Sequence, residues 1–175
     1  MEPTSKPVPL DAKPIGSIYA DSVPIFLHEQ VLDEVLAYSE QDLRRELGGF
    51  LLGGYHRDVR TYVEIRRFWP AVDATSRAAS LTFTHDTWSK LHRDVERQFP
   101  DEMVVGWQHT HPNMGLFLSG YDLFIQQHFF RQPWQVAMVV DPCRREFEFF
   151  QWRGGEIVDC GFYLLPAARS SLRSS

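Results

Sequence analysis

The sequence has 175 residues, of which 43% are hydrophobic and 23% are charged, a composition typical of one globular domain and not of a disordered, collagen-like or coiled-coil chain. Its formal net charge of −5 argues against non-specific binding to nucleic acid, and no apolar run approaches the ~20 residues that span a bilayer. Two cysteines, Cys143 and Cys160, are too few for a disulfide framework. We therefore expect a cytoplasmic protein whose partners include neither nucleic acid nor a membrane.

The two ends of the chain differ in composition from its middle. Residues 1–22 contain four prolines among small and charged residues, which favours extended backbone and predicts an arm or linker. Residues 166–175 are rich in serine and offer little to bury, so we expect a flexible tail. One domain remains, over residues 23–165.

In the first part of this domain, strands and helices alternate. A short strand over residues 23–27 precedes an amphipathic helix, whose apolar residues recur from Val31 to Leu43 and which is expected to end near Glu46. Two apolar runs around residues 50–52 and 62–65 predict a strand hairpin.

The second part continues with two helices and several strands. A helix capped by Thr84 is followed by a buried strand over residues 103–109, and residues 136–165 are rich in strand patterns. A third helix is expected to have one broad apolar face, formed by Tyr121, Phe124, Ile125, His128 and Phe129. This order predicts a mixed α/β (α+β) fold with a central sheet flanked by helices.

The densest cluster of reactive side chains comes at the end of the strand over residues 103–109. His109 and His111 project to the same side because strand side chains alternate with period two, and Asp122 lies in the first turn of the next helix. Two nitrogens and one carboxylate oxygen are three ligands for a divalent cation, and they leave a fourth position open. Catalytic zinc sites have this arrangement, whereas structural sites have four protein ligands.

Hydrolysis at such a site also needs a group that moves the proton of the attacking water. Glu46 is the expected base and then acid, since the glycines that follow it allow close backbone approach; Glu64 is the alternative. Ser119 can direct its hydroxyl at the developing oxyanion, although Ser119-x-x-Asp122 is also the pattern of a helix capping box. The remaining histidines have no ligand spacing, and we interpret them as structural or surface residues.

These residues resemble the signature of the JAMM (JAB1/MPN/Mov34) zinc metalloproteases. The family pattern E-x-x-G-x-L-x-G is present as Glu46, Gly49, Leu51 and Gly53. The second pattern, H-[ST]-H-P-x6-S-x2-D, is present as His109, Thr110, His111, Pro112, Ser119 and Asp122. The resemblance covers residues 23–165 and implies a single MPN/JAB domain, with a curved, mostly antiparallel sheet flanked by helices.

The resemblance also implies a function. A catalytic Zn²⁺ held by His109, His111 and Asp122 would hydrolyse the bond after the C-terminal tail of ubiquitin or a ubiquitin-like protein, with Glu46 and Ser119 as the catalytic residues. E1/E2-like conjugation proteins are expected partners. The short flanks are similar to those of prokaryotic JAB-type, deubiquitinase-like proteins. Two alternatives stay open: a protease that trims a sulfur-carrier precursor, and a non-catalytic MPN scaffold.

Overall fold

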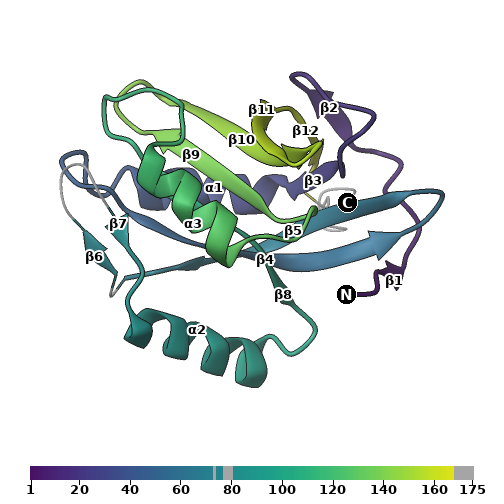
Figure 1. Cartoon of the computed structure of the whole chain (residues 1–175), viewed down its shortest axis with the longest axis horizontal. Coiled ribbons are helices and arrows are strands. Elements are labelled where there is room, and N and C mark those ends of the chain that lie inside the picture. Colours follow the sequence, from purple (N-terminus) through teal and green to yellow (C-terminus); the bar gives the residue numbers. More distant parts are fainter. Residues whose placement is uncertain (73, 77–80, 168–175) are drawn as a thin grey trace, which may run out of the picture.

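The computed structural model describes residues 1–72, 74–76 and 81–167, which form three helices and twelve strands (Figure 1). The helices are α1 (Glu29–Ser39), α2 (His85–Gln98) and α3 (Gly120–Phe129). The strands are β1 (Thr4–Ser5), β2 (Lys13–Ile15), β3 (Ile25–His28), β4 (Gly48–Arg57), β5 (Thr61–Pro70), β6 (Thr75–Ser76), β7 (Leu81–Thr82), β8 (Met103–Thr110), β9 (Val136–Asp141), β10 (Glu146–Arg153), β11 (Glu156–Cys160) and β12 (Phe162–Leu165).

One large sheet organises the molecule. Its strand order is β11-β10-β9-β8-β4-β5-β3-β12-β2, and β1 pairs with β4 outside this path. Only Gly161 separates β11 from β12 along the chain, although the two strands stand near opposite ends of the sheet, so the sheet must curl. The parallel pairs are β1–β4, β3–β5, β3–β12 and β8–β9, and the other neighbours are antiparallel. The predicted mixed α/β domain with a curved, mostly antiparallel sheet is confirmed.

Successive residues of β4 belong to different hydrophobic cores. Leu51 packs on one face of the sheet with Val31 and Val35 of α1. Phe50 and Leu52 face the other side, because side chains alternate along a strand. There they pack with residues of α2 and α3, including Leu91 and Ile125. Figure 1 shows α1 behind the sheet and α3 in front of it.

The first helix is shorter than the sequence predicted. It ends at Ser39, whose hydroxyl donates to the carbonyl of Val35, and Leu43 is 49% exposed instead of buried. The Asp42 carboxylate accepts the Arg44 amide, a local turn that competes with helical hydrogen bonds. Glu46 therefore does not end a helix but lies in the irregular segment between α1 and β4.

The expected apolar face of α3 also differs from the face that is buried. Tyr121, Phe124 and Phe129 are 45%, 48% and 53% exposed, whereas Ile125 is buried together with Asp122 and Gln126. The two polar side chains are buried because each has partners inside the molecule. The periodicity predicted the helix correctly but assigned its buried face incorrectly.

The predicted arm lies against the sheet. Residues 1–22 contribute β1 and β2, which pair with β4 and β12. Of the predicted tail, residues 168–175 lie outside the described part of the chain. Within the part that is described, no helix is long and apolar enough to cross a membrane.

Candidate metal centre

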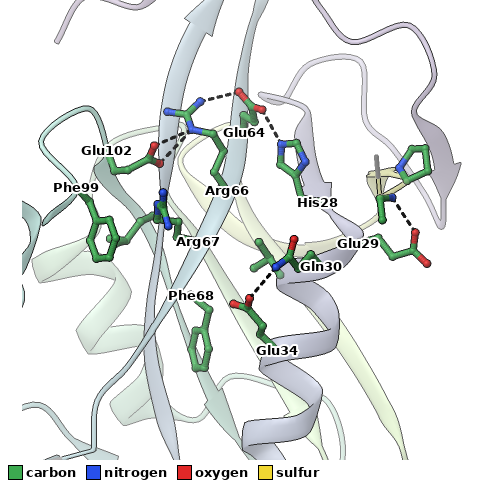
Figure 2. A pocket seen from close by; sticks show the side chains of 14 residues that line it. His28, Glu29, Gln30, Glu34, Glu64, Arg66, Arg67, Phe68, Phe99 and Glu102 are labelled. Carbon is green, nitrogen blue, oxygen red and sulfur yellow. Dashed lines mark hydrogen bonds and ion pairs between the residues drawn. The ribbon is translucent and has the colours of Figure 1, made fainter. Parts of the chain in front are cut away.

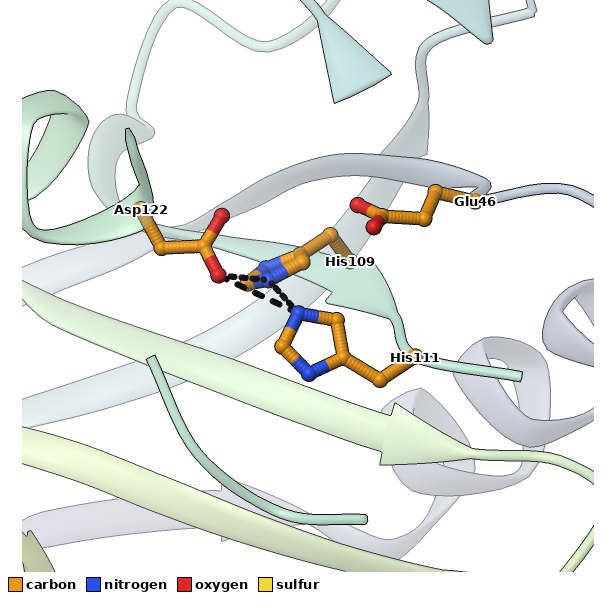
Figure 3. Close-up of side chains that lie close together, drawn as sticks. All are labelled: Glu46, His109, His111 and Asp122. Atoms are coloured by element: carbon orange, nitrogen blue, oxygen red, sulfur yellow. Dashed lines mark hydrogen bonds and ion pairs between the residues drawn. The ribbon is translucent and has the colours of Figure 1, made fainter. Parts of the chain in front are cut away.

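Four side chains from three separate parts of the fold converge on one point (Figure 3). His109 and His111 come from the end of β8, Asp122 from the first turn of α3, and Glu46 from the segment before β4. One ligand atom from each residue lies within 4.8 Å of the others, and all four residues are buried. The structure thus brings together the three residues expected to bind metal and the glutamate expected beside them.

The geometry of the group fits a single divalent cation. The Nε2 atoms of His109 and His111 are 3.0 Å apart, and each lies 3.1 Å from Oδ2 of Asp122. Ligand atoms of a tetrahedral zinc ion are about 3.3 Å from one another, so the three atoms form nearly one face of such a tetrahedron. Two imidazole nitrogens and a carboxylate oxygen are also donors that zinc prefers.

Neighbouring side chains fix the orientation of these ligands. The ring of His109 stacks on Trp107 with centroids 4.5 Å apart, and the Trp107 indole donates to Gln126 at 2.7 Å. The Ser119 amide donates to Oδ2 of Asp122 at 2.9 Å, while the Asp122 amide donates to the Ser119 hydroxyl at 3.1 Å. Ser119 therefore caps α3 and holds the carboxylate. Its hydroxyl hydrogen is not used in the capping bond.

Burial and charge shift the ionisation of the group. Burial raises the pKa of Glu46 to about 7. The charge of His111 lowers this pKa in part, and the charge of Asp122 raises it further. Burial also raises the pKa of Asp122, but hydrogen bonds from His109 and His111 outweigh it and hold that pKa well below its usual value. Near neutral pH, Asp122 is thus an anion. The pKa of Glu46 is close to neutral pH, which suits a group that both accepts and donates a proton.

The glycines that follow Glu46 bring β4 close to its neighbour β5. A Cβ atom at Gly49 would overlap the carbonyl oxygen of Trp69, and one at Gly53 would overlap the carbonyl oxygen of Glu64. The close approach expected from the sequence is present, and no larger residue fits at either position without a backbone shift.

A loop between β8 and α3 borders the centre and is held by a residue that the sequence analysis did not select. The ring of Phe117, from this loop, packs beside the ring of His111, with the two ring centroids 4.6 Å apart. Asp141, at the end of β9, accepts the amides of Asn113 and Gly115 at 2.9 Å each. The sequence feature that could have identified Asp141 is its place directly after a continuous apolar run, where a carboxylate is buried and needs hydrogen-bond donors.

The alternative base, Glu64, lies in a different cluster. Its carboxylate contacts His28 at 2.7 Å, His56 at 3.1 Å, Lys6 at 2.6 Å and Arg66 at 2.7 Å. Burial raises the pKa of Glu64, but these partners lower it far below its usual value. Glu64 also lines a surface pocket of about 500 Å³ beside α1 (Figure 2). It is an ion-pairing anion outside the metal centre, so the expectation of Glu64 as a rival base was wrong.

Two histidines, an aspartate and a glutamate, all buried and with ligand atoms within 4.8 Å of one another, form a group that could hold one metal ion. Residues 21–132 match the family model described as JAB1/Mov34/MPN/PAD-1 ubiquitin protease. This span is most of the chain, and the protein belongs to that family.

The chain is also similar to individual proteins. The chain is 31% identical over 120 residues to the 26S proteasome regulatory subunit rpn11 of Schizosaccharomyces pombe, covering 67% of this chain and 38% of the relative. It is 51% identical over 102 residues to COP9 signalosome complex subunit 5 of Caenorhabditis elegans, covering 57% and 27%. A third relative, NAD(+) hydrolase TcpA of a Theionarchaea archaeon, is 27% identical over 140 residues, covering 79% and 37%. The chain spans less than half the length of these relatives.

A solved structure resembles the fold. The solution structure of a Desulfitobacterium hafniense protein superimposes with a TM-score of 0.58, at 18% sequence identity, and covers 86% of this chain and 98% of that protein. At this identity the likeness concerns the fold alone.

Proposed function

We propose that this protein is a zinc-dependent isopeptidase that hydrolyses the bond after the C-terminal tail of a ubiquitin-like protein. The observation that carries the proposal is the buried glutamate within 4.8 Å of three convergent metal ligands. The ubiquitin protease description of the family supports the substrate class. A cytoplasmic setting fits the free cysteines Cys143 and Cys160.

In this proposal His109, His111 and Asp122 hold the ion, and the protein's own groups move the proton. Zinc, when bound, supplies Lewis acidity that lowers the pKa of water and polarises a carbonyl. Glu46 accepts a proton from the attacking water and returns it to the departing amine, for which a pKa near neutrality is suited. The Ser119 hydroxyl donates to the carbonyl oxygen as negative charge develops there, a contribution of about 3 kcal/mol in comparable sites.

The test compares two substrates of one ubiquitin-like protein. One carries an isopeptide-linked lysine peptide, and the other carries a short C-terminal extension in ordinary peptide linkage. We expect cleavage of the isopeptide by the zinc-loaded protein and a loss of about 100- to 10,000-fold in kcat for Glu46→Gln, because proton transfer by a positioned side chain contributes 10²- to 10⁴-fold.

Other outcomes would assign a different function. Preferred cleavage of the extension would make the protein a precursor-trimming protease, as for a sulfur carrier. A zinc content near zero, or equal rates for wild type and Glu46→Gln, would sink the proposal and favour a scaffold that binds conjugation proteins. Hydrolysis of NAD⁺ is measured in parallel because one relative carries that name.

A further inference from the structure

Glu46 lies in a segment that contains neither helix nor strand. Its side chain is nevertheless buried and directed at the metal centre (Figure 3). Three hydrogen bonds join this segment to Thr110, the residue between the two histidines. Thr110 donates its amide to the Leu47 carbonyl at 2.8 Å, and its hydroxyl accepts the Leu47 amide at 2.8 Å.

The second of these bonds replaces a backbone bond with a side-chain bond. The last pair of the β4–β8 ladder is Gly48 with His109, so Leu47 and Thr110 lie one residue beyond it. At this position the Leu47 amide donates to the Thr110 hydroxyl. The same hydroxyl lies 3.5 Å from the carbonyl of Arg45 and can donate to it, so Thr110 contacts the residues on both sides of Glu46. Thr110 is fully buried.

We propose that Thr110 is the positioning residue that holds Glu46 within reach of the metal centre. This inference rests on the proposed function, since it assigns Glu46 the proton transfer. Without the hydroxyl, the part-buried Leu47 amide would lose this partner, and the segment would shift to regain one. A displacement of about 1 Å at a reacting group can lower a rate by about 100-fold.

The test uses two substitutions at Thr110. Thr110→Val keeps the shape and removes the hydroxyl, whereas Thr110→Ser keeps the hydroxyl and removes the methyl group. We expect Thr110→Val to lower kcat about 100-fold, with KM changed less than about threefold, and Thr110→Ser to retain most of the wild-type kcat. Thr87→Val, a buried threonine of α2, is the matched control and should leave kcat unchanged.

Two readouts do not depend on turnover. Hydrogen exchange of the Leu47 amide should accelerate in Thr110→Val but not in Thr110→Ser, and zinc affinity should be the same in wild type and both variants. Equal exchange in all proteins, or equal loss of kcat in both variants, would show that packing and not the hydroxyl matters, and would overturn the inference. A full kcat in Thr110→Val together with an inactive Glu46→Gln would overturn it while leaving the proposed function intact. If wild type is itself inactive, the proposed function fails, and hydrogen exchange alone decides whether Thr110 anchors the segment.

Discussion

At the residue scale, the carboxyl of Glu46 has a pKa well above its usual value. It is 3% exposed and close to the anion Asp122, so burial raises its pKa to about 7 from the usual 4.5. Such a shift affects stability as well as the proposed proton transfer, because the folded state keeps a proton that the unfolded chain releases. Functional groups are often held in this way at the expense of stability.

The first prediction follows from the sign of that shift. Stability falls as pH rises from 4.5 to 7 and stays lower above pH 7, since the folded-state pKa lies above the unfolded value. In the metal-free protein, Glu46→Gln should therefore raise the free energy of unfolding by up to about 3 kcal/mol at pH 8 and by little at pH 4. Urea unfolding at both pH values measures the effect. Glu156→Gln, at an exposed site on β11, controls for the loss of one negative charge.

The second prediction concerns the proposed ligands. Zinc at 100 times its dissociation constant should stabilise the folded protein by about 2.7 kcal/mol, and a chelator should reverse the effect. His111→Ala should abolish this rise in melting temperature, because one of the three convergent donors is removed. His85→Ala, an exposed histidine on α2, should respond to zinc as wild type does. A normal zinc response in His111→Ala would rule out His111 as a ligand.

At the element scale, the loop after β8 depends on a carboxylate from the neighbouring strand. Oδ1 and Oδ2 of Asp141 accept four backbone amides, from Asn113, Gly115, Cys143 and Arg144. Burial raises the pKa of Asp141, but these four donors outweigh it and lower the pKa. The end of β9 thereby fixes the start of the loop that carries Phe117 to the ring of His111.

The third prediction tests this support. Asp141→Asn replaces one accepting oxygen with a donor, and should lower the free energy of unfolding by about 2 kcal/mol at pH 7. Because the folded-state pKa lies below 3.8, the stabilisation is present above that pH and is lost as pH falls through the folded pKa. Denaturant melts between pH 7 and pH 2.5 should therefore show the difference from wild type shrinking only at the acidic end. Asp159→Asn, exposed on β11, should show no comparable loss at pH 7.

Two elements show where periodicity fails as a guide. The helix predicted to reach Glu46 ends at Ser39, because a local turn at Asp42 and pairing with β8 compete for the chain. In α3 the apolar stripe points outward, because Asp122 and Gln126 have hydrogen-bond partners inside the molecule. A hydrophobic pattern indicates that a helix forms, but it does not show which polar side chains are buried together with their hydrogen-bond partners.

At the scale of the whole molecule, the N-terminal segment is tied into the sheet. β1 and β2 pair with β4 and β12, and Lys6 reaches the carboxylate of Glu64 at 2.6 Å. The Tyr62 hydroxyl lies within hydrogen-bond distance of the carbonyls of Lys6 and Pro7, at 3.1 and 3.0 Å. The composition of this segment predicted extended backbone, but the contacts that hold it involve residues far away in the sequence.

The fourth prediction separates a supporting segment from a linker. Deletion of residues 1–22 should lower the free energy of unfolding by about 3 kcal/mol or more. The reason is that Glu64 loses the ammonium group of Lys6, and that β4 and β12 each lose a short strand paired with them. Zinc affinity should not change, because none of the four residues of the centre belongs to this segment. Calorimetry and zinc titration of the shortened protein check both statements. A shortened protein as stable as the full chain would identify the segment as a linker only.

The sequence by itself determined those features that depend on neighbours a few residues apart. The His-x-His parity, the capping pattern of Ser119 and Asp122 and the cap at Thr84 are set by local backbone geometry, and the structure has each of them. Only the tertiary structure decided which carboxylate joins the histidines. Glu46 and Glu64 both follow the first helix, and the pairing of β4 with β8 places the first beside the centre, while β5 carries the second to Lys6 and His28. Such contacts join residues far apart in the sequence, for example Leu47 and Thr110, which are 63 positions apart. They follow from the packing of whole strands, which no local pattern encodes.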